Sequence, residues 1–175
     1  IIGFFWKIGA DYIFFSKLIN ILLGIGSIVL TYRIAAKLFD ELIALYTILF
    51  LCLSKTFFLY NSVLQTEIPS MFFFLFGFYL FLQKKEKLSG LLFGIVFMTR
   101  LFQIFLIIPV IITYFYGVLI RKEKIKNITL FILYFFIPIT PYLIFNLYFY
   151  GDIFYPLNLQ IFMTKNTGWI FNQHV

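Results

Sequence analysis

Long apolar runs separated by short basic clusters make up most of this chain. Six runs can be drawn, at residues 12–32, 41–58, 68–82, 88–98, 103–119 and 128–148. Runs that are apolar on every side are typical of helices inside a bilayer. Hydrophobic residues make up 63% of the 175 residues, more apolar surface than a soluble domain of this size can bury. The sequence therefore predicts an all-α fold, a polytopic transmembrane helical bundle of about six membrane segments in a single domain, residues 1–175.

The basic residues predict how the chain crosses the membrane. Nine of the fourteen lie in three clusters, at positions 33–37, 84–87 and 121–126. If every run crosses, all three clusters fall on one side, and the positive-inside rule makes that side the cytoplasm. A multi-pass protein of the cell membrane follows, with membrane lipid as a partner and with the C-terminal tail, residues 149–175, outside. The net charge of +7 is explained by topology, so no nucleic acid partner is predicted.

Residues 88–119 do not divide simply into spans. As one straight helix they would be about 48 Å long, whereas the hydrocarbon layer needs about 30 Å. A single span would also place the two strongest basic clusters on opposite faces. We therefore predict a hairpin of short helices that breaks near Arg100, with Gly90 and Gly94 packed closely against a neighbouring helix. A single tilted helix with Arg100 facing protein is the alternative.

Glu67 is one of two isolated charges that stand out among the apolar runs. It follows Thr66 and precedes Pro69 at the start of an apolar segment. One interpretation is structural: Thr66 caps a helix, Glu67 meets the positive end of the helix dipole, and proline is tolerated in the first turn. The other is functional, with the carboxylate at the outer mouth of the bundle contacting a sugar or acceptor hydroxyl, a cation or a catalytic partner. The two interpretations are compatible.

Arg100 is the second isolated charge. On the predicted outer side it runs against the positive-inside rule, and its planar guanidinium suits phosphate oxygens. We therefore expect Arg100 to bind a phosphate, with snorkelling to the interface as the alternative. Lys55 lies on the same predicted face and could add charge, although interfacial snorkelling suits it better, as it does Lys17.

The remaining polar features indicate little chemistry. We interpret residues 146–156 as an aromatic belt with a Gly-Asp turn, followed by a loop; a groove for a lipid chain or a sugar is the alternative. Cys52 is the only cysteine, and His174 has no partner at ligand spacing, so no metal is predicted. The sequence has no Gly-rich phosphate loop, nucleophile elbow or Cys/His array, and no cofactor is predicted.

Several short motifs occur in the order seen in one membrane enzyme family. They lie at residues 8–24, 32–39, 66–69, 90–100 and 146–156. Together they resemble the GT-C-type glycosyltransferases that use a polyprenyl-phosphate sugar, the protein mannosyltransferase and aminoarabinose transferase relatives. The resemblance covers most of the chain.

The resemblance implies inverting transfer of a sugar from a polyprenyl-phosphate donor to an acceptor on the outer face. It assigns Arg100 to the lipid phosphate, while Glu67 remains a candidate for the sugar or acceptor pocket. The family's catalytic Asp lies in an outer loop before the helix that starts here near residue 12, so the catalytic residue is unknown and Asp11 does not match it. The chain is expected to be an N-terminally incomplete part of a larger GT-C-type membrane domain.

The alternative class is a non-catalytic polytopic membrane protein, either part of a transporter or a scaffold subunit. Transporters commonly contain helices broken in mid-membrane and paired halves. Here no repeat is visible, and most of the prolines Pro69, Pro109, Pro138 and Pro141 are predicted to lie toward the ends of segments. This pattern favours the glycosyltransferase.

Overall fold

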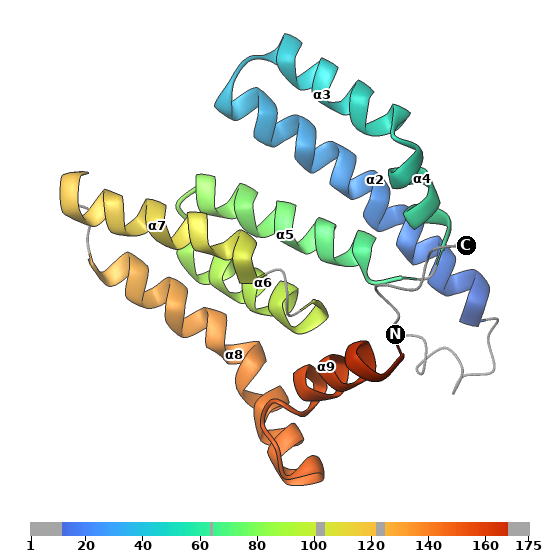
Figure 1. Ribbon diagram of the computed structural model, residues 1–175. Coiled ribbons are helices and arrows are strands. Elements are labelled where there is room, and N and C mark those ends of the chain that lie inside the picture. The colour runs from blue at the N-terminus through green and yellow to red at the C-terminus, as the bar shows by residue number, and fades with distance from the viewer. Residues whose placement is uncertain (1–11, 64, 101–103, 122–124, 168–175) are drawn as a thin grey trace.

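The computed structural model describes residues 12–63, 65–100, 104–121 and 125–167. These residues form helices and short connections without a strand (Figure 1), which confirms the all-α prediction. The helices are α2 (Tyr12–Leu38), α3 (Glu41–Leu53), α4 (Lys55–Ser62), α5 (Glu67–Leu82), α6 (Glu86–Thr99), α7 (Ile104–Arg121), α8 (Ile125–Tyr150) and α9 (Tyr155–Thr167).

Helix α6 lies at the centre of the bundle. It packs against α5 and α8, while α2 covers α5 and carries α3 and α4 on its outer side (Figure 1). Buried side chains of α6, α7 and α8 form the core cluster, with phenylalanines of α5 packed around it; its buried members include Phe93, Ile107, Val110, Tyr114 and Phe131. Aromatic rings therefore fill the centre, as the high phenylalanine content requires.

Two glycines let α6 approach the backbone of α8. A Cβ atom added at Gly90 would overlap the carbonyl oxygen of Phe131, and one at Gly94 would overlap that of Phe135. Both glycines are buried. The predicted close packing of Gly90 and Gly94 is confirmed, and α8 is the neighbour.

The chain breaks at Arg100, as predicted. Helix α6 ends at Thr99 and α7 begins at Ile104, so residues 88–119 do not form one helix. The two helices run in opposite directions (Figure 1), which makes them a hairpin. Helix α6 is about 21 Å long, shorter than the hydrocarbon layer of about 30 Å.

The predicted segment 41–58 is instead two helices. They meet at Ser54 with a bend of 60°. Ser54 ends α3 and caps α4, because its hydroxyl oxygen accepts a hydrogen bond from the backbone N–H of Phe57 at 3.4 Å. The sequence signal was present, since a serine inside an apolar run is a common N-cap.

The first helix continues past its predicted end at residue 32. Arg33 and Lys37 lie within its last turns instead of beyond it. The Nζ atom of Lys37 donates a hydrogen bond to the carbonyl oxygen of Leu82 at 2.8 Å, at the end of α5. Lysine near a helix C-terminus is favourable, so this basic cluster does not stop the helix.

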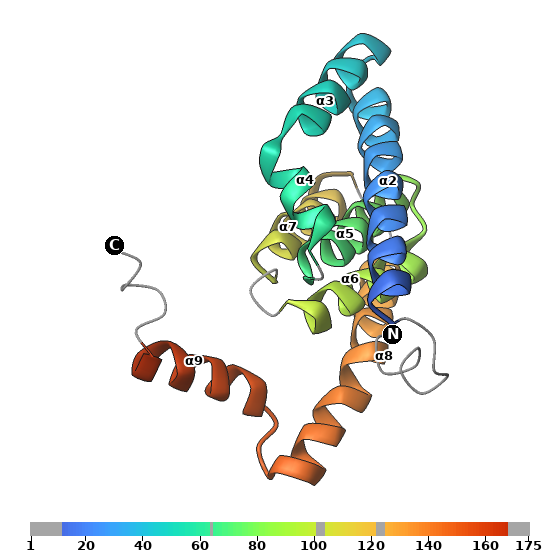
Figure 2. The ribbon, with the colours of Figure 1, turned by 90° about the vertical axis from the view of Figure 1, so that its right-hand side faces the viewer.

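The C-terminal part differs from the prediction in two ways. Pro138 and Pro141 lie inside α8, and Pro109 lies inside α7, so these prolines are not at segment ends. Helix α8 bends along its length (Figure 1), as expected when proline removes a backbone donor. The tail, predicted to be a loop, contains helix α9, which lies apart from α5, α6 and α7 (Figure 2).

The surface of the bundle is that of a membrane protein. Large apolar side chains are exposed along the helices, including Phe14, Phe50, Phe105 and Tyr148. Helix α2 from Ile13 and helix α8 are long and apolar enough to cross a bilayer, and the bent α3–α4 pair makes a third if it is one span. Helix α5 and residues Ile107–Gly117 are shorter apolar helices. A bundle apolar outside as well as inside fits hydrocarbon surroundings.

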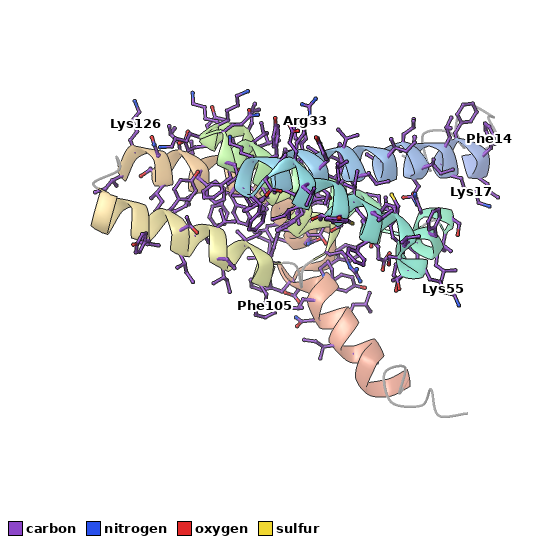
Figure 3. All side chains as sticks on the ribbon, turned by 90° about the horizontal axis from the view of Figure 1, so that it is seen from above. Phe14, Lys17, Arg33, Lys55, Phe105 and Lys126 are labelled. Carbon is purple, nitrogen blue, oxygen red and sulfur yellow. The ribbon has the colours of Figure 1, made fainter. Side chains whose placement is uncertain are left out.

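The two ends of the bundle differ in which helix ends lie there. The C-terminal ends of α2, α5 and α7 lie at one end, and the C-terminal ends of α4 and α6 lie at the other (Figure 1). Lys126 marks the first end, and Lys17 and Lys55 mark the second (Figure 3). We call these the basic end and the opposite end.

Candidate functional site

Glu67 begins α5 at the opposite end of the bundle. Thr66 occupies the N-cap position, but its backbone is helical, with φ −84° and ψ −5°, and its side chain makes no cap hydrogen bond. The predicted side-chain cap by Thr66 is therefore wrong. Glu67 is in the first turn and Pro69 follows within it, as predicted. The helix dipole favours a carboxylate in the first turn of a helix.

Arg100 ends α6 at the same end of the bundle. Its backbone N–H donates to the carbonyl oxygen of Val96 at 3.0 Å, which closes the last helical turn. The backbone of Arg100 itself is extended, with φ −150° and ψ 104°. The chain leaves the helix at this residue, so the guanidinium lies at the helix end.

The two isolated charges form an ion pair. The Nη1 atom of Arg100 lies 3.3 Å from the Oε1 atom of Glu67. The side chain of Glu67 is 24% exposed and that of Arg100 is 43% exposed. The sequence placed both residues at one end of the bundle, and the structure brings them into direct contact.

The second carboxylate oxygen of Glu67 is in a different situation. Its Oε2 atom is buried and has no hydrogen-bond partner among the described residues. A buried charged acceptor without a donor is costly. This oxygen is therefore suited to a donor group that enters the site, such as a hydroxyl.

Packing between α5 and α6 fixes the position of the pair. The two helices are antiparallel, so the start of α5 meets the end of α6 (Figure 1). The buried hydroxyl of Ser89 donates to the carbonyl oxygen of Gly77 at 2.9 Å, and the rings of Phe74 and Phe93 lie 5.6 Å apart. These contacts lock the register that sets Glu67 opposite Arg100.

Lys17 and Lys55 lie at the same end but point to solvent or lipid. Both are exposed, and both are far from Lys126 (Figure 3). Lys55 is the first residue of α4, next to the Ser54 bend. Their exposure agrees with interfacial snorkelling, while Arg100 has a defined acidic partner.

Asn20 is a residue that the sequence interpretation missed. Its Nδ2 atom lies 3.1 Å from the carbonyl oxygen of Tyr60, 3.0 Å from that of Asn61 and 3.2 Å from that of Val63. The side chain is 4% exposed and holds the end of α4 against α2. An amide in the middle of an apolar run was the available signal, because polar groups in membrane helices rarely lack a role.

The predicted Gly-Asp turn joins α8 to α9. Gly151 has φ +68°, a backbone conformation that favours glycine. The carboxylate of Asp152 accepts from the N–H of Phe154 at 2.9 Å and from the amide of Asn158 at 2.7 Å. The buried Asn146 donates to the carbonyl oxygen of Ile153 at 3.3 Å. The aromatic segment thus ends in an ordered turn.

Two residues weighed in the sequence lie outside the described part of the chain. These are Asp11 and His174. Within the described ranges, no three His, Cys, Asp or Glu side chains come together as a metal site. The sequence placed Glu67 and Arg100 at the same end, and the structure shows that they form an ion pair.

Comparison with known proteins decides the family. The family model described as dolichyl-phosphate-mannose-protein mannosyltransferase matches residues 1–145. This chain belongs to that family. The match spans α2 to α7 and most of α8, and so includes both Glu67 and Arg100. Neither a curated protein nor a solved structure gives a significant match.

Membership of the mannosyltransferase family confirms the resemblance drawn from the short motifs. With the apolar helices, it identifies the chain as a membrane protein of a glycosyltransferase family.

Proposed function

We propose that this protein takes part in transfer of a sugar from a polyprenyl-phosphate carrier to an acceptor on the outer face of the membrane. The carrier phosphate contacts Arg100, and Glu67 faces the sugar or acceptor. The observation that supports the proposal is the Glu67–Arg100 ion pair with the second oxygen of Glu67 unpartnered. The family match supports the reaction class.

The ion pair links the phosphate contact of Arg100 to the sugar or acceptor contact of Glu67. Arg100 has five N–H donors, and its contact with Glu67 runs through Nη1. A phosphate that approaches the exposed side of Arg100 competes with the Glu67 carboxylate for that guanidinium. Carrier binding would therefore loosen Glu67 and free its carboxylate to accept a hydrogen bond from a hydroxyl.

The test of the phosphate contact is the binding of a polyprenyl-phosphate sugar to the purified protein. Arg100→Lys keeps a positive charge next to Glu67 but removes the planar fork, and we expect about tenfold weaker binding. Arg100→Ala should weaken binding further. Lys55→Ala is the matched control, because it removes a cation from the same end without touching the ion pair. Unchanged affinity in both Arg100 variants would remove the site.

The test of Glu67 separates binding from transfer. Glu67→Gln removes the competitor of the phosphate, so carrier binding should be at least as tight as in the wild type. Transfer should fall, because a neutral amide accepts a hydrogen bond less strongly than a carboxylate. Weaker carrier binding with a normal transfer rate would contradict the division of roles.

The proposal includes a membrane orientation. The basic end faces the cytoplasm, and the opposite end, with Glu67 and Arg100, faces out. In a Cys52→Ser background, single cysteines at positions 85 and 122 should resist a membrane-impermeant reagent in intact cells. A cysteine at position 55 should react. Labelling at position 85 or 122 in intact cells would reverse the orientation and place the ion pair inside.

A non-catalytic transporter part is the second candidate. Its supporting observation is the pair Pro138 and Pro141 inside α8, because transporters use helices interrupted within the membrane. Solute flux through proteoliposomes that hold the protein would support this function. Sugar transfer that depends on Glu67 in the same proteoliposomes would support the glycosyltransferase.

A further inference from the structure

A cavity of about 370 Å³ lies at the basic end, between the α5–α6 turn and α7. Aromatic side chains line it, namely Phe81, Tyr114 and Tyr116. Its charged lining residues are Lys84 and Glu86. The cavity is distant from the Glu67–Arg100 pair, because that pair lies at the other ends of α5 and α6.

The backbone places Lys84 in this cavity in an unusual way. Lys84 has φ 58°, the left-handed conformation that favours glycine. Its N–H donates to the carbonyl oxygen of Phe81 at 2.9 Å, and the N–H of Lys85 donates to that of Leu80 at 3.0 Å. This is the pattern that ends many helices with a glycine. A lysine in this conformation costs backbone strain, and its side chain lines the cavity.

The charge at this end points to an anionic ligand. Among the described residues, positions 83–87 and 125–126 contain four basic residues and one acidic residue, a net charge of +3. Lysines and tyrosines at the end of a membrane bundle lie at the depth of lipid headgroups. Basic pockets between membrane helices bind anionic headgroups. Glu86 offsets one charge at the cavity, and the surrounding surplus outweighs it.

We propose that this cavity binds the headgroup of an anionic glycerophospholipid. Lys84 contacts the phosphate, and the aromatic lining from α5 and α7 receives the glycerol and the upper part of the acyl chains. The ligand would join the α5–α6 turn to α7. This proposal is independent of sugar transfer, since it uses neither Glu67 nor Arg100.

The experiment is lipid binding to the detergent-purified protein, followed by native mass spectrometry. Phosphatidylglycerol should bind at least tenfold more tightly than phosphatidylcholine. Lys84→Gly is the decisive variant, because glycine suits the left-handed turn and the fold should be kept. We expect at least tenfold weaker phosphatidylglycerol binding, with a thermal midpoint equal to or above that of the wild type.

Two further variants distinguish lipid binding in the cavity from attraction of the lipid by the overall positive charge of the basic end. Lys126→Gln removes one charge at the same end from a residue that is not among the described lining residues, and binding should change less than twofold. Thr113→Trp fills the cavity without changing charge and should reduce lipid binding as much as Lys84→Gly does. Equal binding of the two lipids, wild-type binding by Lys84→Gly, or inorganic phosphate binding as tightly as the lipid would overturn the proposal.

Discussion

Helix α6 is more deeply buried than helix α3, although α3 has the more apolar sequence of the two. Helix α3 has the more apolar sequence, yet only Ala44 is buried, and Phe50 and Leu53 are more than 70% exposed. Helix α6 begins with Glu86 and Lys87 and contains Ser89, Gly90 and Gly94, yet it is the most enclosed helix described.

The comparison teaches what drives packing in a bilayer. Hydrocarbon surrounds a leucine as well as another helix does, so apolarity alone does not draw helices together. Small residues allow close backbone approach and many van der Waals contacts. Gly90 and Gly94 supply this on α6, and the single buried residue of α3 is also small, Ala44.

The largest effect is expected from Gly94→Leu. A Cβ atom at Gly94 would lie 2.6 Å from Cγ of Pro138 and would overlap the Phe135 carbonyl, so α6 and α8 must move apart. We expect a loss of about 3 kcal/mol, with Gly90→Leu similar, measured by unfolding in mixed detergent micelles. Gly77→Ala is the control, since its Cβ would meet Leu92 at an ordinary 3.4 Å. A wild-type midpoint for Gly94→Leu would break the comparison.

Sequence patterns predicted the elements whose signals are local. The helical class, the hairpin that breaks at Arg100, and the packing role of Gly90 and Gly94 follow from composition, charge placement and residue size. Helix α9 was missed because its sequence is only weakly apolar.

Features that depend on tertiary partners could not be predicted. The continuation of α2 to Leu38 relies in part on Lys37 reaching the carbonyl of Leu82, which is 45 residues away in sequence. The ion pair is an intermediate case. The sequence placed Glu67 and Arg100 at the same end, but their contact depends on the register between α5 and α6.

The next largest effect is expected at Asn20, whose side chain joins α2 to the end of α4 by hydrogen bonds. Asn20→Leu would leave the carbonyl oxygens of Tyr60, Asn61 and Val63 without this donor. Hydrogen bonds between membrane helices contribute about 0.6 kcal/mol each, so we expect a loss of about 1–2 kcal/mol. Unfolding in mixed micelles measures it, with Leu22→Ala on the exposed face of α2 as the control. A loss no larger than in the control would show that α4 is held by other contacts.

The Glu67–Arg100 pair should contribute little to the free energy of unfolding, although both charges are isolated among apolar helices. Arg100 is 43% exposed, so solvent screens the pair. A double-mutant cycle with Glu67→Gln and Arg100→Gln should give a coupling of about 0.5–1 kcal/mol that decreases at high salt. A much larger, salt-insensitive coupling would mean that the pair is structural, and would weaken its assignment to ligand binding.

The smallest effect is expected from Phe50→Ala on α3. The Phe50 side chain is 73% exposed, so in a bilayer its ring contacts lipid in the folded state and would contact lipid in the unfolded state as well. The change in unfolding free energy should stay within about 0.5 kcal/mol, in micelles and in bicelles alike. A loss as large as that of Gly94→Leu would show that another protein surface covers the outer face of α3. In that case α3 would be packed like α6, and the contrast between the two helices would describe only the isolated chain.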